Sequence, residues 1–286
     1  MNKKSKTNAK DDHIYVESIK KSKRIVVKIG SSSLTHKTGK LNLKRIGSLV
    51  RTLSDLSNAG KEIILVTSGA VPAGAGKLGM KIPLDKIGDK KAAAAVGQAD
   101  LMNIYNRFFS SYGVNIAQIL LTRDVVESEL RRKEAEETFS VLIKMGCVPI
   151  VNENDTVSSD ELNFSGNDIL SAYVSKLCGA DLVINFSDQD GLYDKNPSEH
   201  KDAKLIHLVT ELTPEVLAYA GGAGSLRGTG GFVTKLQAAQ LLTRDNTPMV
   251  IANAKDPEIL YDILDGIIAG TIIINNAECR MQNYDN

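Results

Sequence analysis

The sequence predicts an α/β protein in which helices cover both faces of an open, mostly parallel β-sheet. Short apolar runs rich in β-branched residues alternate with helix-like segments along most of the 286 residues, as expected for buried parallel strands joined by helices. Polar residues follow several of these runs, and ligands of such sheets bind beyond the carboxyl ends of the strands. The runs number about seven and are unevenly spaced, which disfavours an eight-stranded barrel.

After an N-terminal tail, the chain forms a strand, a helix and a second strand. The run "RIVVKIG" (24–30) is apolar and ends in glycine, which predicts a buried strand. Apolar residues then recur at helical spacing from Leu43 to Leu56, and Gly60 is expected to end this helix. The run "EIILVTSG" (62–69) predicts the second strand.

The middle of the chain continues this alternation. The stretch "GAGKLG" (74–79) fits a dinucleotide-binding glycine pattern, but it begins several residues after its strand, so we interpret it as a glycine-rich loop. An Ala-rich helix is expected over 89–112 and a charged amphipathic helix over 130–145. Strands are expected over 114–122 and 147–155.

The last third of the chain repeats the same pattern around one long loop. The expected elements are, in order, a helix over 167–178, a strand over 180–188, the loop, a helix after Gly231, a strand over 247–253, a helix over 257–264 and a strand over 270–275. Since parallel strands end at the same edge of a sheet, the polar segments that follow them should lie together.

The domain organisation is simple. Residues 1–22 are expected to be a polar tail, disordered to about residue 13, ahead of one domain over 23–286. The formal net charge of +1 argues against a dedicated nucleic-acid binder. There is no secretory signal, no run of about 18 apolar residues, and no metal pattern among the three cysteines. These features predict a cytoplasmic protein that binds neither membrane nor nucleic acid.

Two lysines occupy positions that suit a phosphate group. Lys28 lies near the end of an apolar strand, where an ammonium is costly unless it meets an anion, and Gly30 and Ser31 follow with donors for phosphate oxygens. In "GTGGFVTK" (228–235), three glycines precede Lys235 at the start of a helix, a setting that favours anions. Taken singly, Lys28 could extend to the surface and the glycine loop could be merely mobile. Together they predict a two-lysine clamp for phosphoryl transfer.

Amides and carboxylates gather in two further motifs. "VNENDTV" contains Asn152 and Asp155, and "SGNDILS" contains Asn167 and Asp168. Asp168 alone could serve only as a favourable charge at a helix start. At the ligand edge of the sheet, however, this mixture suits a small zwitterion, with carboxylates for its ammonium and amides for the rest of the molecule.

A series of motifs between residues 23 and 275 has a familiar order. They read "VVKIGSSSLT", "VTSGAVPAG", "AAVGQADLM", "QILLTRDV", "VPIVNENDTV", "GNDILSA", "SDQDGLYDKNP" and "GTGGFVTKLQAA". Together they closely resemble the glutamate 5-kinases, within the amino acid kinase family. The resemblance implies an α/β/α sandwich in which the part before about residue 180 mainly binds substrate and residues 180–286 mainly bind ATP.

The resemblance also implies an activity. ATP would donate its γ-phosphoryl group to the side-chain carboxylate of L-glutamate, giving L-glutamyl 5-phosphate, the first intermediate of proline biosynthesis. This nucleophile is already ionised at neutral pH, so catalysis reduces to aligning and neutralising two anions. Mg²⁺ is expected to bridge the ATP phosphates and to need no dedicated protein site.

Site residues follow by the same resemblance. The catalytic residues are expected to be Lys28, Lys235 and Asp168, the last of which would order the two lysines. The expected glutamate contacts are Ser68, Asp155 and Asn167, beside Asn152 of the same polar cluster. The expected ATP contacts are Ser187, Asp188, Thr229, Gly230, Gly231 and both lysines, in addition to Gly30 and Ser31.

Further expectations concern partners and assembly. Proline is the expected feedback inhibitor, the chain is expected to form a homo-oligomer (dimer or tetramer), and a glutamyl-phosphate reductase is the expected next enzyme. Many bacterial relatives carry a second domain of the PUA type after the kinase domain, and no such domain is expected within these 286 residues.

Three alternatives remain open at the level of sequence. A sister kinase would act on N-acetylglutamate or aspartate, and Asp155 bears on this choice because a free ammonium favours a carboxylate partner whereas an acetylated nitrogen does not. A non-catalytic sensor would bind an amino acid or a nucleotide on the same fold. A nucleic-acid binder would use the Lys-rich tail, with binding that depends steeply on salt.

Overall fold

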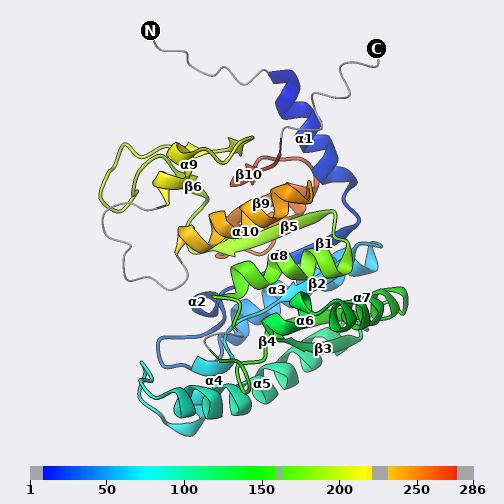
Figure 1. Cartoon of the computed structure of the whole chain (residues 1–286), viewed down its shortest axis with the longest axis vertical. Coiled ribbons are helices and arrows are strands. Elements are labelled where there is room, and N and C mark those ends of the chain that lie inside the picture. Colours follow the sequence, from blue (N-terminus) through cyan, green and yellow to red (C-terminus); the bar gives the residue numbers. More distant parts are fainter. Residues whose placement is uncertain (1–8, 160–162, 221–230, 276–286) are drawn as a thin grey trace.

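The computed structural model describes residues 9–159, 163–220 and 231–275 (Figure 1). Within these residues an eight-stranded sheet runs in the order β3-β4-β2-β1-β5-β9-β10-β8. Neighbouring strands are parallel except for β9 and β10, which are antiparallel. The strands are β1 (Arg24–Lys28), β2 (Glu62–Val66), β3 (Ile116–Leu121), β4 (Val148–Glu153), β5 (Leu182–Ser187), β8 (Leu208–Val209), β9 (Met249–Asn253) and β10 (Thr271–Ile273). The predicted open and mostly parallel sheet is confirmed.

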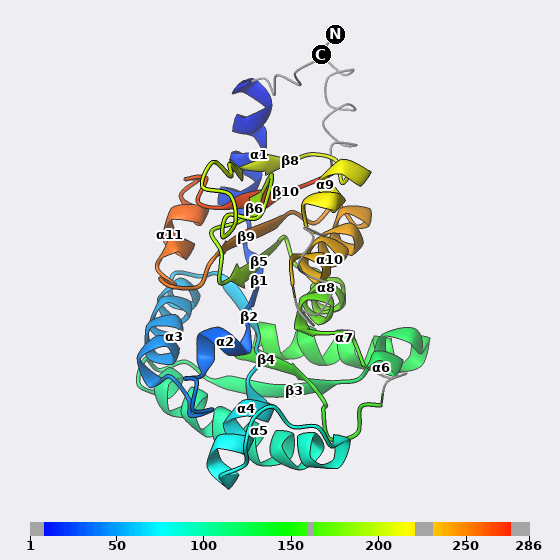
Figure 2. The ribbon, with the colours of Figure 1, turned by 90° about the vertical axis from the view of Figure 1, so that its left-hand side faces the viewer.

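Helices cover both faces of the sheet, so the fold has three layers (Figure 2). One apolar core contains side chains of α3 (Leu43–Asn58), α5 (Ile87–Ser110) and α11 (Ile259–Leu264). The other contains side chains of α7 (Glu129–Lys144), α8 (Asn167–Cys178) and α10 (Phe232–Arg244). The shorter helices are α2 (Ser31–Leu34), α4 (Ala70–Leu78), α6 (Arg123–Glu127) and α9 (Pro214–Tyr219).

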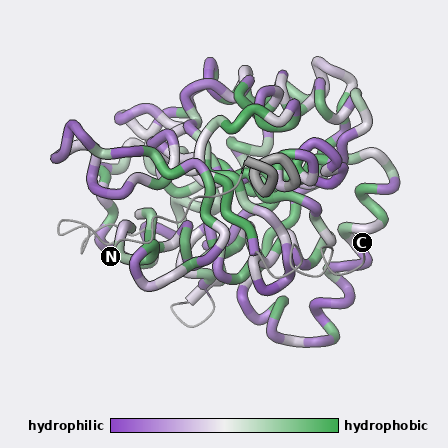
Figure 3. The backbone as a smooth tube through the Cα atoms, turned by 90° about the horizontal axis from the view of Figure 1, so that it is seen from above, coloured by the Kyte–Doolittle hydropathy of each residue, from purple (hydrophilic) through white to green (hydrophobic). Residues whose placement is uncertain are grey.

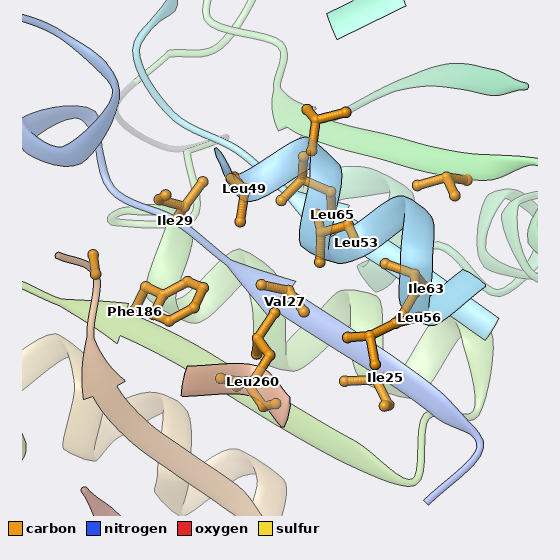
Figure 4. Packing of buried hydrophobic residues seen from close by; sticks show 14 of the residues in the cluster. Ile25, Val27, Ile29, Leu49, Leu53, Leu56, Ile63, Leu65, Phe186 and Leu260 are labelled. Carbon is orange, nitrogen blue, oxygen red and sulfur yellow. The ribbon is translucent and has the colours of Figure 1, made fainter. Parts of the chain in front are cut away.

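Alternate side chains of each strand serve the two cores. In β1, Ile25 and Val27 join one core and Val26 joins the other, because successive side chains of a strand point to opposite faces. In the view of Figure 4, Val27 lies next to Leu53 and Ile25 next to Leu56, both residues of α3. Seen from above, hydrophobic segments gather in the interior and hydrophilic ones at the periphery (Figure 3). Burial on both faces explains why the strand segments are so uniformly apolar.

The predicted N-terminal tail is wrong over residues 9–21. These residues form helix α1 (Ala9–Lys21), in which Tyr15 and Ile19 are buried. The two side chains are four residues apart and therefore share one face of the helix, which lies against α11. The sequence of this segment has few apolar residues among many charges, which suggests exposure to solvent. A helix with one narrow apolar face is nevertheless stable when that face packs against the rest of the fold.

The interpretation of "GAGKLG" as a loop is also wrong, since most of it lies within α4. Its glycines allow two helices to touch. A Cβ placed on Gly74 would overlap the carbonyl oxygen of Ala93 in α5, and a Cβ on Gly97 would overlap that of Ala70 in α4. Tertiary packing thus outweighs the low helix propensity of glycine, and the contact fixes α4 firmly against α5.

Three very short strands were not expected from sequence. β8 extends the main sheet beside β10, while β6 (Leu192–Tyr193) and β7 (Leu205–Ile206) form a separate antiparallel pair. Strands of two residues are too short to produce an alternating pattern that sequence analysis can detect. Among the described residues, no helix has the length and apolar character needed to cross a membrane.

Candidate active site

The carboxylate of Asp168 holds two buried lysines at the carboxyl edge of the sheet. Asp168 is the second residue of α8, Lys28 ends β1, and Lys235 lies in the first turn of α10. Lys28 Nζ is 2.6 Å from Asp168 Oδ1, and Lys235 Nζ is 3.1 Å from Asp168 Oδ2. The three side chains are at most 7% exposed. Such deeply buried charges are costly to assemble, which indicates a functional cluster.

Two neutral groups complete the surroundings of Asp168. Asn185 of β5 is fully buried, and its Nδ2 donates to Asp168 Oδ1 at 2.8 Å. Thr234 Oγ1 donates to Asp168 Oδ2 at 2.6 Å. β5 pairs with β1 so that Asn185 stands in register with Lys28. Asp168 is therefore held by donors from β1, β5 and α10, which fixes where the two ammonium groups lie.

The electrostatics of the cluster favour an anion. Burial alone would raise the pKa of Asp168, but Lys28 and Lys235 outweigh it and hold the pKa of this carboxyl well below its usual range. Burial and the charge of Lys235 lower the pKa of Lys28 from 10.5 to about 8, against the opposing effect of Asp168. With both lysines protonated, two ammonium groups and one carboxylate leave one net positive charge.

A cleft of about 370 Å³ opens on this cluster. Besides the two lysines, four of the predicted ATP contacts line it: Gly30, Ser31, Ser187 and Asp188. Gly231 precedes α10 with an extended backbone, while Thr229 and Gly230 lie outside the described residues. The cleft thus brings polar groups after β1 and β5 to the two lysines, as expected at the carboxyl edge of a parallel sheet.

A row of hydrogen-bonded side chains runs inward from this cleft. Asn167 Nδ2 lies 2.8 Å from Ser68 Oγ and 2.9 Å from Asn152 Oδ1. Asn152 Nδ2 in turn donates to Gln98 Oε1 at 3.0 Å. We call Ser68, Asn167, Asn152 and Gln98 the amide chain. Ser68 and Asn167 line the cleft, whereas Gln98 lines a different cavity, so the amide chain connects the two.

The second cavity has a volume of about 290 Å³ and is lined by carboxylates that have no cationic side chain beside them in its lining. Glu153 and Asp155 both line it, and no lysine or arginine of the described chain does. Burial, and then the charge of Glu153, raise the pKa of Asp155 to about 6. We call this the acidic cavity. Its electrostatics favour a ligand that brings a positive charge.

Comparison with known proteins identifies the family. The sequence profile of the amino acid kinase family matches residues 23–253 of this chain. The chain is 51% identical over 262 residues to the glutamate 5-kinase of Clostridium perfringens, covering 90% of this chain and 97% of that protein. It is 46% identical to the glutamate 5-kinase of Listeria innocua, with 92% and 96% covered. The chain belongs to the glutamate 5-kinases of the amino acid kinase family.

Membership of this kinase family makes the chain a phosphotransferase. Solved structures agree on the fold. The UMP kinase of Bacillus anthracis aligns with a TM-score of 0.61 at 17% identity, covering 90% of this chain and 97% of that chain. The UMP kinase of Ureaplasma parvum aligns with a TM-score of 0.62 at 16% identity, covering 89% and 100%. At such low identity these likenesses concern the fold alone.

The site residues predicted from sequence lie in two places, the cleft and the acidic cavity. The residues predicted for catalysis, Lys28, Lys235 and Asp168, are in mutual contact at the cleft. Of the predicted glutamate contacts, Ser68 and Asn167 line the cleft, Asn152 is buried in the amide chain, and Asp155 lines the acidic cavity. The predicted substrate contacts therefore extend from one cavity to the other.

Three residues of this site were missed in the sequence. Asn185 interrupts an apolar strand, and that interruption is the signal that could have identified it. Thr234 directly precedes Lys235, and only the turn of α10 shows that it faces Asp168. Gln98 lies within an Ala-rich helix, where a glutamine gives no local indication of its contact with Asn152.

Proposed function

We propose that this chain transfers the γ-phosphoryl group of ATP to the side-chain carboxylate of L-glutamate, giving L-glutamyl 5-phosphate. The observation that carries the proposal is the pair of buried lysines held by one carboxylate at the cleft. Two anions must approach each other in this reaction, and the cluster offers them one net positive charge. The family membership supports the same assignment.

In this proposal the lysines neutralise the phosphoryl group as it moves. A lysine about 4 Å from a phosphate oxygen contributes about 4 kcal/mol at an effective dielectric constant near 20. Asp168, with Asn185 and Thr234, holds the two ammonium groups in place before substrates arrive, so little reorganisation is needed during the reaction. The acceptor carboxylate is already ionised, so no general base is required.

The amide chain and the acidic cavity would orient the acceptor. The side-chain carboxylate would lie near Ser68 and Asn167 at the cleft, and the ammonium would lie near Asp155. An ionised Asp155 is favoured by a neighbouring cation, which suits a free α-ammonium rather than an acetylated nitrogen. The acidic cavity therefore favours L-glutamate over N-acetylglutamate.

ATP and Mg²⁺ would share the opposite side of the cleft. Gly30, Ser31, Ser187 and Asp188 are positioned to contact the nucleotide. Mg²⁺ would be bound mainly by the phosphates of ATP and would keep several of its waters. Asp188 would be its protein contact, since Asp168 is taken up by the two lysines. When bound, Mg²⁺ would supply further neutralisation of phosphate charge.

Assembly, location and regulation are part of the same proposal. The proposed location is the cytoplasm. A homo-oligomer is supported by β3, an edge strand with partly exposed apolar side chains, because such an edge tends to pair with another chain. Proline would act as feedback inhibitor. The acyl phosphate product would pass to a glutamyl-phosphate reductase.

The test measures ADP release from ATP and Mg²⁺ with L-glutamate, N-acetylglutamate, L-aspartate or no acceptor, and traps the acyl phosphate with hydroxylamine. Turnover and hydroxamate with L-glutamate alone are expected. Preference for another acceptor would assign a sister kinase activity. Folded protein that binds ATP but turns over no acceptor would overturn the proposal in favour of a sensor.

A further inference from the structure

Gln98 stands at the inner end of the amide chain with one polar group unused. Its Oε1 accepts the hydrogen bond from Asn152 Nδ2, and the residue is 8% exposed. Its Nε2 is buried and has no hydrogen-bond partner among the described residues. A buried donor without an acceptor destabilises a fold, and native proteins leave few of them. A ligand acceptor would explain why this donor is retained.

The surroundings of Gln98 indicate which acceptor would fit. Gln98 lines the acidic cavity together with Asp155, whose carboxylate has no cation near it in that cavity. A ligand that satisfies both groups must bring a cation for Asp155 and an acceptor for Gln98 into this one cavity. The ammonium and carboxylate on the α-carbon of an amino acid have this arrangement. With no lysine or arginine of the described chain lining the cavity, neutral donors must bind the carboxylate.

The position of Gln98 is firmly fixed. It follows Gly97, at which α4 and α5 touch without room for a Cβ. Ser68 lies just before the start of α4, so the same contact sets the distance between the two ends of the amide chain. Precise placement of this kind is what specificity requires, because a misplaced donor loses its hydrogen bond.

We propose that Gln98 is a specificity-determining residue whose Nε2 donates a hydrogen bond to the α-carboxylate of the acceptor amino acid. This inference rests on the proposed function, since it concerns the same substrate. In this arrangement Asp155 binds the α-ammonium group of the substrate, and Gln98 binds the α-carboxylate beside it. A site built to hydrogen-bond a substrate group discriminates strongly against analogues that lack the group, because its own donor is then left unpaired.

The first test separates this role from simple support of Asn152. Gln98→Glu keeps an oxygen that accepts from Asn152 but replaces the free donor with a negative charge. We expect it to raise the KM for L-glutamate about tenfold to a hundredfold while kcat and the KM for ATP change less than about twofold. Gln237→Glu is the matched control and should leave both KM values unchanged, since Gln237 is an exposed residue of α10 that lines neither the cleft nor the acidic cavity. A Gln98→Glu protein with unchanged KM would overturn the proposal.

The second test uses 4-aminobutyrate, which is glutamate without the α-carboxylate. Its inhibition constant against L-glutamate is measured for the wild type and for Gln98→Met, which removes both polar atoms and adds no charge. The affinity for L-glutamate should fall about tenfold or more, and that for 4-aminobutyrate should change less than about threefold. Equal losses for the two ligands would show that Gln98 only supports the fold.

Failure of the proposed function would be recognised separately. The wild-type protein would then give no hydroxamate with L-glutamate. Calorimetric titration of the same two ligands into wild-type and Gln98→Met protein compares affinities without any turnover. It therefore tests the contact between Gln98 and the α-carboxylate even if the reaction is a different one.

Discussion

Two carboxylates of this molecule lie in opposite electrostatic surroundings. Asp168 sits at the cleft between two lysines, which hold its pKa well below the usual range. Asp155 sits in the acidic cavity near Glu153, and its pKa is raised to about 6. Divergent pKa values of this kind mark different roles. Asp168 is paired with two cations of the protein itself, whereas no lysine or arginine of the described chain lines the cavity of Asp155.

The two sites therefore differ in whether the charges of the protein balance one another. The lysine cluster is complete within the protein, so its geometry is set before any substrate binds. The acidic cavity contains two carboxylates and no lysine or arginine of the described chain, and the proposed contact with an ammonium group rests on this imbalance of charge. Asp155, with its raised pKa, and the unpaired donor of Gln98 share this cavity, and each of them destabilises the fold in the absence of a ligand.

The largest effect is expected when the lysine cluster is broken. Lys28→Met or Lys235→Met should lower kcat about a thousandfold, because each removes a charge that stabilises the moving phosphoryl group. Steady-state ADP release measures this. Lys176→Met is the control, since Lys176 is an exposed residue of α8 that pairs with Asp245, and it should keep full activity. A Lys235→Met protein with near wild-type kcat would contradict the catalytic role.

The next effect concerns the packing behind the acidic cavity. Gly74→Ala should lower the free energy of unfolding by about 3 kcal/mol, because its Cβ would overlap the backbone of Ala93. Gly88→Ala in the same helix pair meets open space and should instead stabilise the protein by about 0.5–1 kcal/mol. Urea unfolding measures both. Equal effects of the two substitutions would show that helix propensity, rather than contact between α4 and α5, determines the loss.

Asp155→Asn is expected to stabilise the fold while weakening substrate binding. The folded-state pKa of about 6 exceeds the ordinary value of 3.8, so ionised Asp155 costs about 2–3 kcal/mol at neutral pH. This cost disappears as the pH falls from 6 towards 4, and the stability difference between variant and wild type should shrink over the same range. Thermal unfolding at pH 7 and pH 4 tests this.

The control for that substitution is Asp85→Asn, at an exposed position, which should leave both stability and the KM for L-glutamate unchanged. In Asp155→Asn the KM should rise as stability increases. A rise in KM without any gain in stability would mean that the carboxylate is not destabilised in the free protein.

The smallest effects are expected in the pH profile. As the pH falls through about 6, Asp155 gains a proton and loses its attraction for an ammonium, so kcat/KM for L-glutamate should decline by about tenfold per pH unit. As the pH rises through about 8, Lys28 of the free protein loses its charge and kcat/KM should decline again. Asp155→Asn should remove only the acid limb. An acid limb that survives in that variant would assign it to another group.

Local patterns in the sequence determined much of this protein. Runs such as 63–66 are apolar throughout because both faces of the sheet are buried, and that uniformity predicts strand, fold class and ligand edge together. Lys28 and Lys235 could be recognised as site residues because a charge at the end of an apolar strand or after a glycine run conflicts with its local surroundings. Such conflicts are visible without knowledge of tertiary contacts.

Tertiary structure alone decided the rest. Helix α1 depends on burial of Tyr15 and Ile19 against a distant helix, and Gly74 lies in a helix because Ala93 leaves no room for a side chain. The separation of Asp155 from Asp168 into two cavities, and the link from Gln98 to Asn152 across 54 residues, likewise arise only when remote segments meet. Sequence patterns report which side chains must be buried or paired, whereas the partner is chosen by the three-dimensional packing.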